Sequence, residues 1–166
     1  MSKSIIQEIE SLVARLSNVL LIQGKTFAVA ESCTGGWLAK MVTDLEGSSA
    51  WFLGGVVSYS NESKNKLLGV PMNCINEYGA VSEQVAEFMV DGVQKVFLST
   101  VSVSITGIAG PLGGTKDKPV GLVCFGVKHS KERVKLRQQV FKGDRNDVRL
   151  QAVKMALLLV IEEVAV

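Results

Sequence analysis

The sequence predicts an α/β protein, organised as a single three-layer α/β/α domain with a mixed sheet. Segments with helical periodicity alternate along the chain with short apolar or alternating segments, which favours helices layered on a sheet. The chain has 166 residues, of which 47% are hydrophobic and 20% charged. A chain of this size and composition buries one core without disulfides. We therefore expect one domain over residues 1–166.

The first part of the chain is predicted to alternate helix, strand and helix. Apolar residues recur at helical spacing over residues 4–23, and Gly24 is a typical helix end. The apolar segment 26–30 is predicted to be a buried strand. A second helix is expected after the glycines, over residues 36–44.

The middle of the chain continues the alternation. Residues 52–60 are rich in β-formers, and Asn61 is a plausible N-cap for a short helix in the following "ESKNKLLG". A longer helix is expected after Ser82, which can cap it. Polar and apolar residues alternate over 101–106, which predicts a strand.

The last part of the chain is predicted to hold a loop, a strand pair and a helix. Residues 107–121 carry many glycines and two prolines, as a loop does. The segments 122–130 and 133–141 resemble a hairpin pair of strands. The final helix is expected to begin near Asp144 and to run to the end of the chain.

Composition and charge exclude several classes of function. The net charge is +2, which offers no basic footprint for nucleic acid. No apolar run approaches the roughly 20 residues of a membrane span. The three cysteines have no CxxC spacing, which favours reduced thiols and a cytoplasmic location. No His/Cys/Asp cluster has metal-ligand spacing, so neither a metal nor another cofactor is expected.

The stretch "AESCTGG" (30–36) is the first candidate site. A strand, a turn of small residues and a helix can aim free backbone N–H groups at an anion. Ser32 and Thr34 add hydroxyl groups, and Gly35 allows close approach. The alternative is a tight strand-to-helix connection with a capping hydroxyl.

A second candidate is "GSSAWFLGGVVSYSNESK" (47–64). A serine becomes a nucleophile when a base takes its proton. The one histidine, His129, lies in a surface-like "KHSK" setting, which argues against a Ser-His-Asp triad. A lysine whose pKa is lowered by burial can replace it. Tyr59 and Lys64 lie five residues apart and can face one pocket. The alternative is a strand end followed by a solvated helix.

Two further stretches can contribute to a site. In "ITGIAGPLGG" (105–114) a strand ends at Thr106 and a glycine loop follows, and such loops build sites in α/β sheets. In "KGDRNDVR" (142–149) Arg145 can meet a phosphate at the start of the last helix. The alternatives are a flexible connection and a helix capped by Asp144 with a solvated Arg145.

The order of these motifs resembles the CinA C-terminal domain family. The match comprises "AESCTGG", "GSSAWFLGGVVSYSNESK", "GAVSE", "TGIAGPLGGTKDKPVG" and "FKGDRNDVR" and runs from Thr26 to Arg149. The resemblance implies an amidohydrolase that works without metal on a serine-lysine site. Single-domain members hydrolyse the carboxamide of nicotinamide mononucleotide (NMN), giving nicotinate mononucleotide and ammonia in pyridine-nucleotide salvage. The resemblance also implies that the protein forms a homo-oligomer, with a dimer favoured.

The resemblance implies roles for individual residues. Ser49 is expected to be the nucleophile, Lys64 its general base, and Tyr59 the group that holds or polarises the pair, with Ser48 as a neighbour. The "ESCTGG" loop is expected to form one wall and to hold the phosphate or the oxyanion, and Arg145 is the candidate for the phosphate. The expected substrate-binding residues are Ser32, Thr34, Gly35, Ser48, Thr106, Gly107, Gly110 and Arg145.

Two other functions remain open at this point. One is a catalytically silent, nucleotide-binding or competence-linked protein that keeps the pocket. The other is an amidase for a different small amide, such as nicotinamide riboside. Release of ammonia separates the first from an enzyme, and a requirement for the phosphate separates the second from an NMN amidase.

Overall fold

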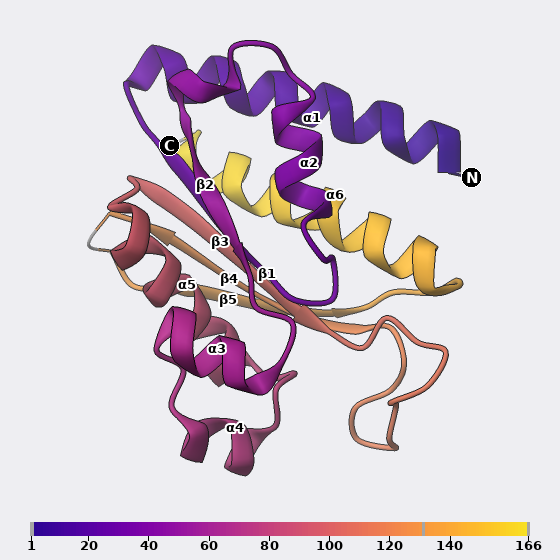
Figure 1. Cartoon of the computed structure of the whole chain (residues 1–166). Coiled ribbons are helices and arrows are strands. Elements are labelled where there is room, and N and C mark those ends of the chain that lie inside the picture. The colour runs from indigo at the N-terminus through magenta and orange to yellow at the C-terminus, as the bar shows by residue number, and fades with distance from the viewer. Residues whose placement is uncertain (1, 131, 166) are drawn as a thin grey trace.

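The structure, a computed structural model, describes residues 2–130 and 132–165. A five-stranded mixed sheet lies between two layers of helices, which confirms the predicted class (Figure 1). The elements in chain order are α1 Ser2–Gln23, β1 Phe27–Glu31, α2 Trp37–Thr43, η1 Ser48–Ala50, β2 Phe52–Val57, α3 Asn61–Leu68, α4 Met72–Tyr78, α5 Glu83–Phe97, β3 Val101–Gly107, β4 Leu122–His129, β5 Lys135–Val140 and α6 Arg145–Val164.

The sheet has the strand order β2-β1-β3-β4-β5. β1 pairs parallel with both β2 and β3, whereas β3–β4 and β4–β5 are antiparallel. Glu31, the last residue of β1, lies opposite Val57 on β2 and Ile105 on β3. The carboxyl ends of three parallel strands therefore meet at one edge of the sheet, where open α/β sheets bind their ligands.

The core has one part on each face of the sheet. α1, α2 and α6 cover one face, and α3 and α5 cover the other (Figure 1). Trp51 is buried against Phe27, with ring centroids 6.4 Å apart, so it belongs to the core as its apolar neighbours in the sequence suggest. None of the helices in the described part of the chain is both long and apolar enough to cross a membrane.

The structure differs from the sequence prediction at three places. The short helix α4 was not expected. The N-cap of α3 is Ser60 rather than Asn61, because Ser60 accepts from the backbone of Ser63 at 3.0 Å and donates its own N–H to the Ser63 hydroxyl at 3.1 Å. Strand β3 is buried on both faces despite its alternating polarity. Its Ser104 hydroxyl donates to the carbonyl of Ala86 at 2.6 Å, which satisfies the buried group.

Candidate active site

Three polar stretches meet at the carboxyl edge of β1, β2 and β3. Ser32 follows β1, Lys64 lies on α3 just after β2, and Thr106 and Gly107 end β3. They line a cavity of about 200 Å³. The cavity is lined by Ser32, Cys33, Tyr59, Asn61, Lys64, Ala80, Val81, Thr106, Gly107, Ala109 and Arg145.

The centre of this cavity is a serine-lysine pair. The Lys64 ammonium group donates to Ser32 Oγ at 2.9 Å. Its other contacts are the carbonyl oxygens of Ser58 at 2.8 Å and Tyr59 at 3.3 Å. An ammonium group has three protons to donate, so these three acceptors satisfy and orient it. Ser32 and Lys64 are therefore held at proton-transfer distance.

Burial sets the protonation of this pair. Lys64 is 1% exposed, and burial lowers the pKa of its ammonium group to about 8. A substantial share of the lysine is then neutral near pH 8 and able to accept a proton. Burial also raises the pKa of the Cys33 thiol to about 12. Cys33 is therefore a neutral thiol, and the hydroxyl that contacts Lys64 is that of Ser32.

The structure does not bring Ser49 to Lys64. Ser49 is exposed in η1, before the first residue of β2, whereas Lys64 follows the last. Six residues of strand separate the two positions, about 20 Å at roughly 3.3 Å per residue. Ser48 lies in the same distant turn. The structure therefore does not form the expected Ser49–Lys64 pair, because parallel pairing places Lys64 beside the residue after β1 instead.

The turn after β1 serves the site differently from the expectation. The backbone N–H groups of Gly36, Leu38 and Ala39 all donate to the carboxylate of Glu31, at 3.1, 3.1 and 2.8 Å. Those groups are thus already occupied and do not await a phosphate. Thr34 is fully buried, and neither it nor Gly35 lines the cavity. Thr34 and Gly35, which were expected to contact the substrate, therefore lie outside the lining of this cavity.

Tyr59 and Arg145 form the rim of the cavity. One guanidinium nitrogen of Arg145 donates to the Tyr59 hydroxyl at 3.0 Å, and the other donates to the carbonyl of Gly110 at 2.8 Å. Tyr59 contacts Lys64 through its carbonyl oxygen, not through its phenol. Beyond this rim lies a second cavity of about 570 Å³, lined by Ala109, Pro111, Val120, Gly143, Asp144, Arg145 and Asn146. Arg145 and Ala109 thus line both cavities.

The opposite wall comes from β3 and the segment before α5. The Thr106 hydroxyl donates to the carbonyl of Ala80 at 2.8 Å, which joins the two segments. A Cβ atom at Gly107 would lie 2.9 Å from the carbonyl oxygen of Leu122 and 3.1 Å from Cys33 Sγ, so only glycine fits here. Asn61 was missed as a lining residue. Asn61 was predicted to be the N-cap of α3. Because Ser60 is the N-cap instead, the Asn61 side chain is not needed for capping and lines the cavity.

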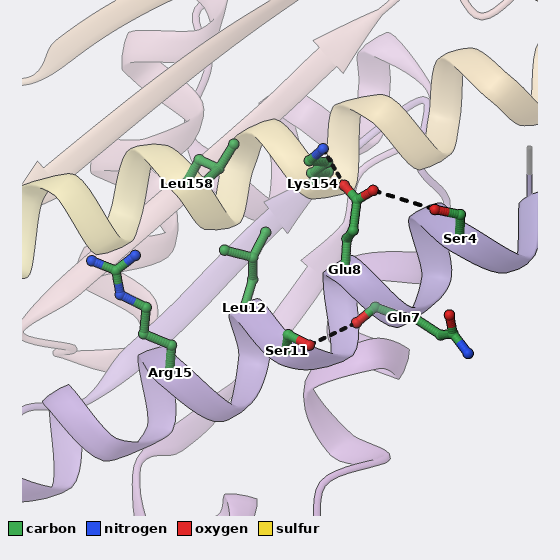
Figure 2. A pocket seen from close by; sticks show the side chains of 8 residues that line it. All are labelled: Ser4, Gln7, Glu8, Ser11, Leu12, Arg15, Lys154 and Leu158. Atoms are coloured by element: carbon green, nitrogen blue, oxygen red, sulfur yellow. Dashed lines mark hydrogen bonds and ion pairs between the residues drawn. The ribbon is translucent and has the colours of Figure 1, made fainter.

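Other features of the described residues lack this chemistry. A groove of about 460 Å³ runs between α1 and α6, and in it Glu8 forms an ion pair with Lys154 (Figure 2). Its lining places no nucleophile beside a buried base. His129, Glu132 and Glu163 place ligand atoms within 4.8 Å of one another. Glu163 is already paired with Lys135 at 2.7 Å. His129 pairs with Val101, the first residue of β3, so this cluster lies at the other end of the sheet.

Comparisons with known proteins agree with this architecture. The family model of the CinA C-terminal domain matches residues 9–164. A nicotinamide-nucleotide amidohydrolase PncC from Enterobacter agglomerans is 46% identical over 95% of this chain and 96% of its own. The PncC of Escherichia coli strain K12 is 45% identical over 90% of this chain and 91% of its own. A crystal structure of a competence/damage inducible protein from Agrobacterium tumefaciens has 37% identity and a TM-score of 0.91, covering 93% of this chain and 94% of that one.

Longer relatives also match. A CinA-like protein from Leptospira biflexa is 48% identical over 143 residues, which are 86% of this chain and 34% of that protein. The chain thus spans about a third of the length of such curated relatives.

Proposed function

The chain belongs to the CinA C-terminal domain family, and from this premise we propose that it hydrolyses the carboxamide of NMN to nicotinate mononucleotide and ammonia. Two relatives that match nearly end to end carry the name nicotinamide-nucleotide amidohydrolase. The observation that carries the proposal is the contact of 2.9 Å between Lys64 Nζ and Ser32 Oγ inside a cavity. An unactivated amide needs an activated nucleophile of this kind.

In the first half of the proposed reaction, Ser32 attacks the carboxamide carbon. Neutral Lys64 takes the Ser32 proton as the new C–O bond forms, and the carbonyl oxygen becomes an oxyanion. The oxyanion then collapses, the C–N bond breaks, and Lys64 returns the proton to the departing nitrogen, which leaves as ammonia. Asn61 lines the cavity, and its amide can donate to the substrate's carboxamide oxygen.

In the second half, water releases the acid. Lys64 is neutral again after ammonia has left, and it takes a proton from the attacking water. The ester bond to Ser32 breaks and the serine oxygen regains a proton from Lys64. The products are nicotinate mononucleotide and free enzyme. A low lysine pKa suits both halves because the same group must accept and release a proton near neutral pH.

The two cavities suggest how NMN is oriented. Sites for whole small ligands commonly occupy about 300–1,000 Å³. The cavity of about 200 Å³ at Ser32 is smaller and suits only the pyridine ring with its carboxamide. The larger cavity across Arg145 then receives the ribose phosphate. Arg145 lines both cavities, which supports the proposal that its guanidinium group pairs with the phosphate.

We further propose that the protein works in the cytoplasm as a homodimer. The cysteines Cys33, Cys74 and Cys124 are free and buried, as suits a reducing compartment. The dimer follows from the family resemblance. Light scattering coupled to size-exclusion chromatography tests it, and a mass of one chain at micromolar concentration would reject it.

The experiment that tests the function follows ammonia and nicotinate mononucleotide after purified protein is mixed with NMN, without added metal. Ser32→Ala and Ser49→Ala are matched variants, because each removes one hydroxyl. We expect Ser32→Ala to lose at least about 10³-fold in kcat and to keep NMN binding. Ser49→Ala should turn over like the native protein.

Each other outcome has a distinct meaning. Collapse of turnover in Ser49→Ala alone would overturn the choice of Ser32. Binding of NMN without release of ammonia by the native protein would indicate the silent paralogue. Equal turnover of nicotinamide riboside would point to an amidase that does not require the phosphate.

A further inference from the structure

We propose that Glu31 and Arg149 are positioning residues, which hold the turn that carries Ser32 so that its hydroxyl meets Lys64. This inference rests on the proposed function and extends it to two residues outside the cavity. Neither side chain lines the cavity, so neither is expected to touch the substrate. The sequence motif contained Glu31, but its role was not assigned.

Glu31 binds the N–H side of the turn. Its carboxylate is fully buried and accepts from three backbone N–H groups at the start of α2. A buried carboxylate is stable only when such donors compensate for its lost hydration. The N-cap residue of α2 is Gly36, which has no side chain to cap the helix. The cap therefore comes from the residue directly before Ser32, and it ties that residue to the helix.

Arg149 binds the carbonyl side of the same turn. From α6, its Nε donates to the carbonyl of Cys33 at 3.1 Å, and a terminal nitrogen donates to the carbonyl of Thr34 at 3.0 Å. Its guanidinium carbon lies 4.8 Å from the ring centroid of Trp37, the first residue of α2. This stacking fixes the plane of the guanidinium group. The turn is thus held from two sides by opposite charges.

The two halves of the catalytic pair are fixed by different elements. The backbone N–H of Ser32 donates to the carbonyl of Ile105 at 3.0 Å, and the turn beyond it depends on Glu31 and Arg149. Lys64 is held independently by carbonyl oxygens of the β2–α3 connection. Their contact of 2.9 Å therefore persists only while both halves keep their places. A displacement of about 1 Å at a reacting group can cost about 100-fold in rate.

The test uses Glu31→Gln and Arg149→Met, which keep side-chain size and remove the carboxylate or the donors. Thr26→Val is the matched control. Thr26 directly precedes β1, at the end of the strand away from Ser32, and exchanges hydrogen bonds with Thr100. Loss of the Thr26 hydroxyl should therefore destabilise the same strand without affecting the turn. Turnover of NMN, thermal unfolding and the pH dependence of kcat/KM are measured for each protein.

We expect kcat to fall about 10–100-fold in Glu31→Gln and in Arg149→Met, with KM changed by less than about threefold. The pH midpoint should stay at the native value, because neither residue sets the pKa of Lys64. Thr26→Val should lose thermal stability and keep the native kcat. If Glu31→Gln fails to fold, Arg149→Met still tests the positioning role.

Failure of this inference is separable from failure of the proposed function. If the native protein releases no ammonia from NMN, the proposed function and this inference fall together. If the native protein hydrolyses NMN and Arg149→Met retains the native kcat, the positioning role is rejected while the proposed function stands. A rise in KM at constant kcat, or a shifted pH midpoint, would also overturn it, since either result assigns the residues to binding or to the base.

Discussion

The sharpest consequence of the site is its pH dependence. Burial lowers the pKa of the Lys64 ammonium group to about 8, and only the neutral amine can act as the base. The neutral share is then about 1% at pH 6, about 9% at pH 7 and about half at pH 8. We therefore expect kcat/KM for NMN to rise about tenfold from pH 6 to 7, about fivefold from pH 7 to 8, and less than about twofold beyond.

The assay is release of ammonia at NMN concentrations well below KM, from pH 6 to 10, with thermal unfolding followed at each pH. Lys64→Arg is the control, because arginine keeps the positive charge and the donors and does not deprotonate in this range. It should lower kcat/KM by about 10²–10⁴-fold. A kcat/KM that stays constant between pH 6 and 9, or near-native turnover by Lys64→Arg, would refute Lys64 as the base.

Arg145, Gly107 and Lys64 each allow one further test. Arg145→Ala should raise KM for NMN about 10–100-fold and change kcat by less than about threefold, because the phosphate loses its partner. The weak turnover of nicotinamide riboside, which has no phosphate, should stay unchanged. Equal KM values for NMN in the variant and the native protein would reject the phosphate contact. Gly107→Ala should lower the free energy of unfolding by about 1–3 kcal/mol, because its Cβ would lie 2.7 Å from Val123 Cγ2 and 2.9 Å from a carbonyl oxygen; an unchanged melting temperature would show that the strand can shift. The pKa of Lys64 is about 8 in the folded chain and 10.5, the ordinary value of a lysine, in the unfolded chain. Between these values the unfolded state binds the extra proton, so the free energy of unfolding should rise with pH by at most about 3 kcal/mol relative to Lys64→Met. Parallel curves of stability against pH for the two proteins from pH 7 to 10 would contradict a buried Lys64 ammonium group.

Much of the fold could be predicted because local patterns determine it. The 3.6-residue spacing of apolar side chains predicted α1, and the paired β-rich segments predicted the β4–β5 hairpin. The short helix α4 was missed because its seven residues carry too little periodicity. The burial of Ser104 was also missed, because a hydroxyl that bonds a helix carbonyl resembles an exposed one in sequence.

The candidate site was predicted in composition but not in pairing. Lys64, Ser32 and Arg145 were all named from the sequence, and the lysine was selected as the base. The difference lies in the partner of Lys64: the expected partner was Ser49, 15 positions away, whereas in the structure it is Ser32, 32 positions away. Sequence distance misleads here because strand β2 lies between Ser49 and Lys64, so the two residues are at opposite ends of that strand.

By itself, then, the sequence predicted the layered class, argued against a Ser-His-Asp triad and named the small group of side chains expected to form the site. The tertiary structure decided which of them act together. Parallel pairing of β1 with β2 and β3 places the residue after β1 beside the start of α3, so that Ser32 meets Lys64. Burial at that edge then lowers the pKa of the lysine. Both effects arise from contacts between distant segments, which no local pattern encodes.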